Sequence, residues 1–165
     1  MEEKKIYLSE NKLKQIYKIL TCHPDYIFYK AVKIHKLYRE AKDTNNRVKK
    51  VFCSFKANRI SSKYNLELYG KFGKNLRIWH GNIIINGSAK LGDNISLHGN
   101  NCIGEKKGKA PIIGNNVDIG YGSVILGDVV IADNVIIGAN SFVNKSITEE
   151  GVVVAGCPAK IIKKK

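Results

Sequence analysis

Hydrophobic positions in the second half of the chain recur every six residues. From residue 113 onward an aliphatic side chain fills every sixth position, usually followed by Gly or another small residue: Ile113, Ile119, Ile125, Ile131, Ile137 and Val143. A helix repeats about every 3.6 residues and a half-exposed strand every two, so neither produces this pattern. It is typical of a three-sided solenoid, in which each face takes six residues and one coil takes about eighteen. Successive coils would stack as parallel strands roughly 4.8 Å apart.

The same period extends upstream through three further positions: Leu91, Leu97 and Ile103. The next step, to Ile113, takes ten residues, which predicts that four extra residues bulge out as a loop within 105–111. Before Leu91 two phases compete, one joining Phe72, Ile78 and Ile84, the other joining Trp79 and Ile85. We therefore expect a one-residue slip within Gly81–Ala89.

The interior and corners of the solenoid follow from the same count. The aliphatic residue of each hexad should point inward, with a small or β-branched residue four positions later: Ile95, Asn101, Val117, Ser123, Val129, Val135 and Ser141. Asp-Asn and Asn-Asn pairs at 93–94, 115–116 and 133–134 suit tight corners. A β-sandwich, the ordinary alternative, does not keep a six-residue count over so many positions.

Residues 1–65 lack the hexads and carry helical signals instead. Three helical segments are expected: Glu10–Leu20 capped by Ser9, Asp25–Ala41 with Pro24 in its first turn, and the short basic segment Arg47–Arg59. Residues 43–46 form the connecting turn. We therefore predict two domains, a helical segment over 1–65 and a β-domain over 66–165.

The chain is strongly basic, with a formal net charge of +14, of which residues 1–65 carry +10 (16 Lys or Arg against 6 Asp or Glu). No nucleic-acid motif accompanies this charge, so a nucleic-acid partner is not expected. The alternatives are contact of the basic helices with an anionic membrane face, an acidic, lipid-linked or polysaccharide substrate, and a merely solvated lysine-rich surface. Neither a membrane span nor a signal peptide is evident.

Cysteine usage and the few histidines narrow the chemistry. The cysteines lack C-x-x-C spacing, which favours a reduced, cytoplasmic setting without structural zinc: Cys22, Cys53, Cys102 and Cys157. Within the repeat, His80 and His98 lie eighteen residues apart, so they should occupy the same side in neighbouring coils. His80 lies at the register slip and suits proton abstraction from a hydroxyl, whereas His98 could be a plain surface residue. A catalytic zinc would need three protein ligands, and the repeat supplies two histidines. For Cys102 a buried, unreactive thiol is favoured over a nucleophile.

Residues 66–165 resemble the hexapeptide-repeat acyltransferases with a left-handed parallel β-helix, and most of all the serine O-acetyltransferase branch with its short members from capsule and lipopolysaccharide gene clusters. The resemblance rests on residues 78–86 (IWHGNIIIN), on the hexads of 91–104, on the loop before Pro111, and on the closing segment 155–162 (AGCPAKII). It implies a mostly β fold with a short helical N-terminal segment, and a homotrimer with acetyl-CoA bound between subunits and no metal.

The resemblance also assigns roles to individual residues. His80 matches the general base that takes the proton of the acceptor hydroxyl for direct transfer, without an acyl-enzyme. Four positions match those where the family meets acetyl-CoA: Gly104, Tyr121, Ala139 and Lys160. Serine acetyltransferases carry Asp before the catalytic His and an Arg-His pair before the loop proline, where this chain has Trp79 and residues 109–110 (Lys-Ala).

These departures favour a sugar hydroxyl over L-serine, because Trp79 could stack on a sugar ring and His98 could orient it. The first hypothesis is therefore an acetyl-CoA-dependent O-acetyltransferase of surface-polysaccharide assembly. The alternatives are a serine O-acetyltransferase, a zinc protein of the γ-carbonic-anhydrase type, and a non-catalytic scaffold whose basic helices dock on a membrane or a partner.

Overall fold

The computed structural model describes residues 11–21 and 23–164, so Ser9 and Glu10 of the first expected helix lie outside the described residues. The chain divides into two compact units, Met1–Leu66 and Glu67–Lys165. Among the described residues no helix is long and apolar enough to cross a bilayer.

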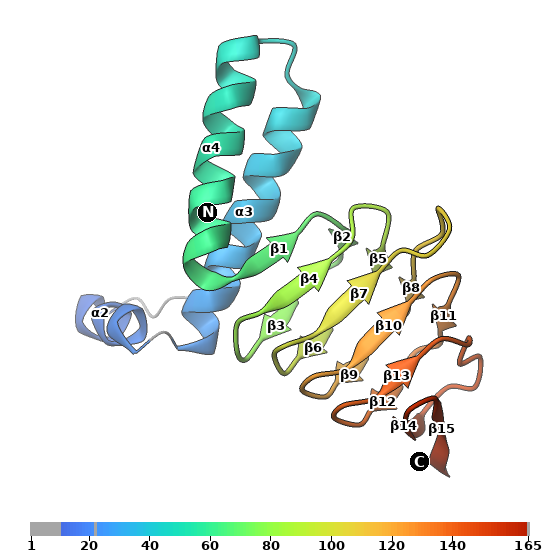
Figure 1. Cartoon of the computed structure of the whole chain (residues 1–165). Coiled ribbons are helices and arrows are strands. Elements are labelled where there is room, and N and C mark those ends of the chain that lie inside the picture. Colours follow the sequence, from blue (N-terminus) through green and yellow to red (C-terminus); the bar gives the residue numbers. More distant parts are fainter. Residues whose placement is uncertain (1–10, 22, 165) are drawn as a thin grey trace. The chain divides into compact units, whose positions relative to one another are not determined.

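The first unit contains the helices α2 (Lys12–Leu20), α3 (Pro24–Asp43) and α4 (Arg47–Tyr64) (Figure 1). Asn11 caps α2, accepting a hydrogen bond from the N–H of Leu13. Asn46 caps α4 in the same way, and α4 ends at Asn65, whose φ of 49° is left-handed. The last helix is therefore longer than the predicted 47–59.

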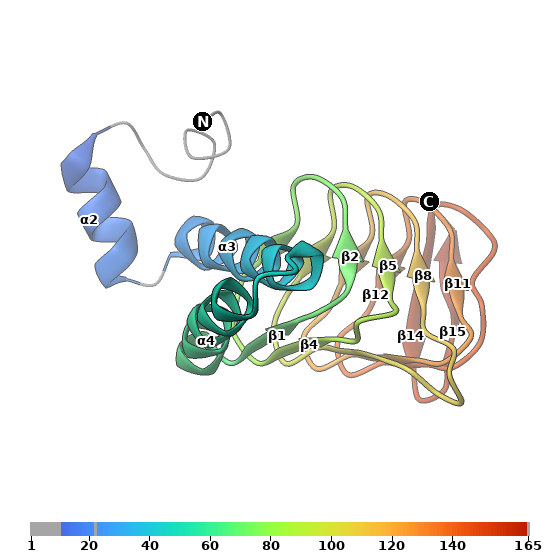
Figure 2. The same cartoon turned by 90° about the horizontal axis from the view of Figure 1, so that it is seen from above.

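Helices α3 and α4 form a hairpin and lie side by side in both views (Figures 1 and 2). Small side chains at their contact let the two helices approach closely: Ala31 and Ala41 on α3, Cys53 and Ala57 on α4, all buried. The Tyr38 hydroxyl on α3 donates a hydrogen bond to Asn58 Oδ1 on α4 (2.7 Å), which adds a polar contact between the two helices.

The second unit is a parallel β-helix built from very short strands. Their bounds are β1 (Leu66–Leu68), β2 (Lys71–Phe72), β3 (Arg77–Ile78), β4 (Ile83–Ile85), β5 (Lys90–Leu91), β6 (Ser96–Leu97), β7 (Cys102–Gly104), β8 (Ile112–Ile113), β9 (Asp118–Ile119), β10 (Val124–Leu126), β11 (Val130–Ile131), β12 (Ile136–Ile137), β13 (Phe142–Val143), β14 (Val152–Gly156) and β15 (Ala159–Lys164). Every third strand pairs, which makes three faces: sheet A (β1-β4-β7-β10-β13), sheet B (β2-β5-β8-β11) and sheet C (β3-β6-β9-β12-β14-β15). Figure 2 shows these strands stacked coil upon coil. The predicted fold class, a mostly β parallel solenoid after a short helical segment, is confirmed.

The pairing register confirms the coil length read from the sequence. Val124 pairs with Phe142, eighteen residues on, and with Cys102, twenty-two residues back. The four additional residues in the longer coil form the exposed loop over 105–109, where Lys106 and Lys109 bridge to each other. Every predicted inward position from Ile95 onward is buried.

The first coil departs from the prediction in one respect. Arg77 pairs with Ser96 nineteen residues on, so this coil holds one extra residue. Ile83 and Ile85 are fully buried, whereas Ile84 is 45 % exposed. The hexads are therefore regular from Ile83 onward. The one-residue slip lies before Ile83, so it does not fall in the larger part of the expected range 81–89. Of the two phases that the sequence left open, Ile78 therefore keeps the inward position before the extra residue and Ile85 keeps it afterwards.

Asparagine columns build two corners of the β-helix. At the corner between sheets B and C, four residues adopt positive φ and pass hydrogen bonds from coil to coil: Asn75, Asn94, Asn116 and Asn134. The corner between sheets C and A repeats this backbone conformation at Asn82, Asn100, Gly122 and Asn140. Asn tolerates the left-handed conformation better than other residues with side chains, which explains its frequency.

Candidate active site

The extra residue of the first coil falls at His80. Backbone hydrogen bonds fix the register on either side: Trp79 N–H donates to Leu97 O (2.9 Å), and Asn100 N–H donates to Gly81 O (3.1 Å). His80 and Gly81 together therefore span a corner that Gly99 alone spans in the next coil. Like a bulged strand residue, His80 is turned out of the regular ladder. Its side chain is exposed, so the imidazole is open to a ligand.

Gly99 leaves the space in which the His80 side chain lies. A Cβ at Gly99 would come within 2.7 Å of His80 Cβ and within 3.2 Å of two ring carbons of Tyr121. The φ of Gly99 is +117°, a value that residues with side chains rarely adopt. The corner thus brings the aromatic ring of Tyr121, 49 % exposed, close to His80 from the next coil but one.

Trp79, His98 and Asp118 form a cluster on the outer face of sheet C, beside His80. The rings of Trp79 and His98 stack with centroids 6.0 Å apart and an interplanar angle of 22°. His98 Nε2 lies 2.9 Å from Asp118 Oδ1, although the contact is not aligned as a hydrogen bond. The nineteen-residue coil places His98 over Trp79, in the coil next to that of His80 and just before the corner at which His80 lies.

A buried amide supports this corner from inside. The Asn101 side chain accepts from the N–H of Gly99 (2.9 Å) and donates to the carbonyl of Gly120 (2.7 Å). Asn101 is 1 % exposed, so these bonds satisfy the donor and acceptor of a buried side-chain amide. In the following coils a serine hydroxyl replaces this amide: Ser123 and Ser141 both donate a hydrogen bond to the carbonyl of Gly138.

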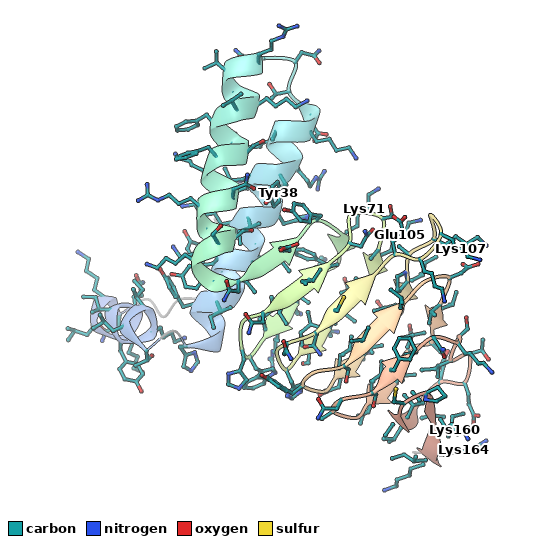
Figure 3. The ribbon with its side chains drawn as sticks, viewed as in Figure 1. Tyr38, Lys71, Glu105, Lys107, Lys160 and Lys164 are labelled. Atoms are coloured by element: carbon teal, nitrogen blue, oxygen red, sulfur yellow. The ribbon has the colours of Figure 1, made fainter. Side chains whose placement is uncertain are left out.

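The remaining predicted residues are spread along the β-helix. Ala139 lies at the same corner as Tyr121, one coil further on, because Asn140 N–H donates to Tyr121 O. Lys160 is exposed on the last strand of sheet C and is labelled in Figure 3. Gly104 instead ends β7 on sheet A, where it pairs with Leu126. A single chain therefore groups His80, Tyr121 and Ala139 at one corner and leaves Gly104 at another.

The loop before Pro111 carries a cation that is already neutralised. Lys109 Nζ pairs with Asp128, and this hydrogen-bonded partner raises the pKa of Lys109. Glu105 and Lys107 project from the same loop (Figure 3). The position where serine acetyltransferases were expected to carry an Arg-His pair is thus occupied by a lysine paired with the next coil of the same chain.

Neither Cys102 nor a metal site adds obvious chemistry here. Burial, and next the nearby Glu67 carboxylate, raise the pKa of the Cys102 thiol, which lowers its nucleophilic fraction. Across residues 11–21 and 23–164, no group of three or more His, Cys, Asp and Glu side chains is placed to hold a metal ion. Sequence reasoning missed Gly99, Asn101 and Asp118 as parts of the site, because their contacts are made between coils and leave no local pattern in the sequence.

Residues 110–145 match the family model described as bacterial transferase hexapeptide (six repeats). The repeat of these residues is therefore similar to that of the bacterial hexapeptide transferases. A serine acetyltransferase of Staphylococcus epidermidis is 37 % identical over 134 residues, covering 78 % of this chain and 60 % of its own length. The present chain thus spans about 60 % of the length of this relative.

Two solved structures of serine acetyltransferases are similar to this chain. The serine acetyltransferase of Neisseria gonorrhoeae in complex with serine has a TM-score of 0.69 at 28 % identity, over 83 % of this chain and 56 % of its own. The serine acetyltransferase of Brucella abortus in complex with coenzyme A has a TM-score of 0.70 at 26 % identity, over 86 % of this chain and 56 % of its own. All three relatives are serine acetyltransferases, so they favour the serine alternative over the surface-polysaccharide role that the sequence analysis placed first.

Proposed function

We propose that this chain is an acetyl-CoA-dependent O-acetyltransferase in which His80 is the general base. The observation that carries the proposal is the exposed imidazole at the one-residue insertion of a hexapeptide-transferase coil. His80 takes the proton of the acceptor hydroxyl while the hydroxyl oxygen attacks the thioester carbonyl. Collapse of the tetrahedral intermediate releases the acetyl ester and the thiol of coenzyme A, so no acyl-enzyme is formed.

The elongated co-substrate would run along the corner that begins at His80. Tyr121 and Ala139 follow at successive coils, and Lys160 lies on the last strand of sheet C. Five strand steps of roughly 4.8 Å separate the Trp79 level from Lys160, about 24 Å in all. Tyr121 and Ala139 would line the pantetheine arm, and the Lys160 ammonium would meet the phosphates or the adenine end.

The separate position of Gly104 supports a homotrimer. Gly104 lies at a different corner of its own chain from His80, so one acetyl-CoA can reach both positions only if Gly104 comes from a neighbouring subunit. In this arrangement each site lies between two β-helices, and the trimer closes by repeating the same contact.

L-serine is the first acceptor to test, because the 37 % identical relative is a serine acetyltransferase. A sugar hydroxyl is the second candidate, favoured by the Trp79–His98 stack held at Asp118 beside the base. An indole face binds a sugar ring by stacking, and the Asp118 carboxylate can accept hydrogen bonds from its hydroxyls. A sugar acceptor would agree with the predicted role of this chain in surface-polysaccharide assembly.

The decisive experiment measures coenzyme A thiol release from acetyl-CoA with L-serine, nucleotide sugars and oligosaccharides in parallel. His80→Ala should lower turnover about 10²- to 10⁴-fold with any accepted substrate. His23→Gln, a substitution outside the β-helix, is the matched control and should leave turnover unchanged. Unchanged turnover by a folded His80→Ala protein would refute the role of His80.

A further inference from the structure

Helix α2 presents an apolar stripe that is exposed in the part of the chain that the structure describes. Its members follow the i, i+3, i+4, i+7 pattern of one helix face and are all more than half exposed: Leu13 (75 %), Ile16 (51 %), Tyr17 (63 %) and Leu20 (78 %). No residue of Lys12–Leu20 is buried. An amphipathic helix of this kind gains little from its own unit and has its apolar face available for another surface.

Helix α4 repeats the same pattern on the side that faces away from α3. The stripe consists of Val48 (79 %), Val51 (69 %), Phe52 (54 %) and Phe55 (61 %). With Arg47 these residues line an open apolar hollow of about 530 Å³. Cys53, Ala57 and Ser61, on the opposite side of the helix, are buried. The packing of α3 and α4 is therefore complete without the stripe.

The polar residues around both stripes carry one sign of charge. Within the two helices the charged residues are Lys12, Lys14, Lys18, Arg47, Lys49, Lys50, Lys56, Arg59 and Lys63, and no acidic residue occurs in either. Lys56 Nζ lies 4.2 Å from the centroid of the Phe52 ring, so the lysine extends along the stripe with its ammonium at the edge. Apolar residues bordered by Lys and Arg are the composition of helices that lie in the plane of an anionic membrane surface.

We infer that α2 and α4 dock on an anionic lipid surface, with their apolar stripes among the acyl chains and their lysines at the headgroups. A second copy of the chain fits less well, because pairing two stripes would bring the basic borders together without an acidic partner. Nucleic acid fits less well too, because four adjacent aliphatic and aromatic side chains on α4 would remain exposed to water. This inference does not depend on the proposed acetyl transfer.

The test is co-sedimentation of the full chain with vesicles of phosphatidylcholine alone and of phosphatidylcholine containing phosphatidylglycerol. We expect at least about tenfold stronger binding to the anionic vesicles, weakening as salt is raised. Val51→Ser/Phe52→Ser/Phe55→Ser should lower this binding at least about tenfold. All three side chains are exposed, so this variant should fold, and circular dichroism and gel filtration establish that it does.

A matched pair of variants separates a specific surface from general basic charge. Lys49→Gln/Lys56→Gln/Arg59→Gln removes three charges beside the α4 stripe and should lower binding at least about tenfold. Lys71→Gln/Lys90→Gln/Lys107→Gln removes three exposed charges from the β-helix and should leave it within about twofold. Equal loss in both variants, or equal binding to neutral vesicles, would overturn the proposal.

Two further outcomes would assign the stripe to another occupant and equally overturn the proposal. One is a fall in molecular mass of the serine variant in lipid-free solution, which would identify a second copy. The other is loss of binding to a DNA duplex with unchanged vesicle binding, which would identify nucleic acid. Thiol release is measured on every variant, and it should match the unmodified chain whether or not vesicles bind.

Discussion

At the residue scale, Gly99 controls the space beside His80. Gly99→Ala would place a methyl group 2.7 Å from His80 Cβ on a backbone with φ of +117°. We expect the imidazole to be displaced and turnover to fall at least about tenfold, with a loss of stability of about 1–3 kcal/mol from the backbone conformation. Thiol release and urea denaturation measure the two effects.

The matched control is Gly108→Ala, which also has positive φ but meets no atom within 4 Å. It should share the backbone penalty and retain turnover. If Gly99→Ala keeps full turnover, or if both variants lose it alike, the space at Gly99 is not what positions His80.

Asp118 offers a second test at the same scale, on the acceptor side. Asp118→Asn keeps the shape of the side chain but removes the charge 2.9 Å from His98 Nε2. If this cluster orients the acceptor, the KM for the acceptor should rise about tenfold, with the KM for acetyl-CoA unchanged. Steady-state kinetics with each substrate varied separately measures this. A change in both KM values together would point to a structural role instead.

At the scale of the elements, Asp133 ties two coils together at the corner between sheets B and C. The backbone N–H of Asn115, and next its side-chain amide, hold the pKa of Asp133 below its usual value. A carboxyl with a lowered folded-state pKa contributes stability above its unfolded pKa of 3.8 and loses it as the pH falls through the folded value. Acidification below about pH 4 should lower the melting temperature of the unmodified chain. We expect the same acidification to lower the melting temperature of Asp133→Asn by a smaller amount.

The control for this prediction is Glu105→Gln, because Glu105 is an exposed carboxylate of the loop. Its acid sensitivity should equal that of the unmodified chain. Identical melting curves for Asp133→Asn and the unmodified chain from pH 7 to pH 2.5 would show that the corner contact contributes nothing measurable.

The elements also show how far sequence reasoning reaches. From Leu91 onward each hexad carries its own aliphatic and corner residues, so local pattern alone predicted the coils, the loop and the buried positions correctly. The run Ile83–Ile85 fits two phases equally, and only hydrogen bonds between coils decide that the extra residue lies at His80. The same one-residue shift explains why Gly99 was missed, because it changes which residues of the first two coils meet.

At the scale of the whole molecule, the outer face of sheet A is the surface best suited to subunit contact. Its outward column is apolar over four coils: Ile84, Cys102, Val124 and Phe142. Ile84 is 45 % exposed in the single chain, which a neighbouring subunit would cover. The outward column of sheet B is mixed: it combines two lysines, Lys71 and Lys90, with the exposed Ile112 and Val130.

We therefore expect a trimer of about three times the 18.4 kDa chain mass, which Val124→Lys should dissociate because it would bury an unpaired charge in the contact. Light scattering after gel filtration measures both. Ile112→Lys, on the outer face of sheet B, is the matched control and should stay trimeric. Because Gly104 and His80 lie at different corners of one chain, a dissociated Val124→Lys protein should also lose acetyl-CoA binding while His80 is intact. A monomer that still binds acetyl-CoA with full affinity would place the whole co-substrate site within one β-helix and contradict the shared site.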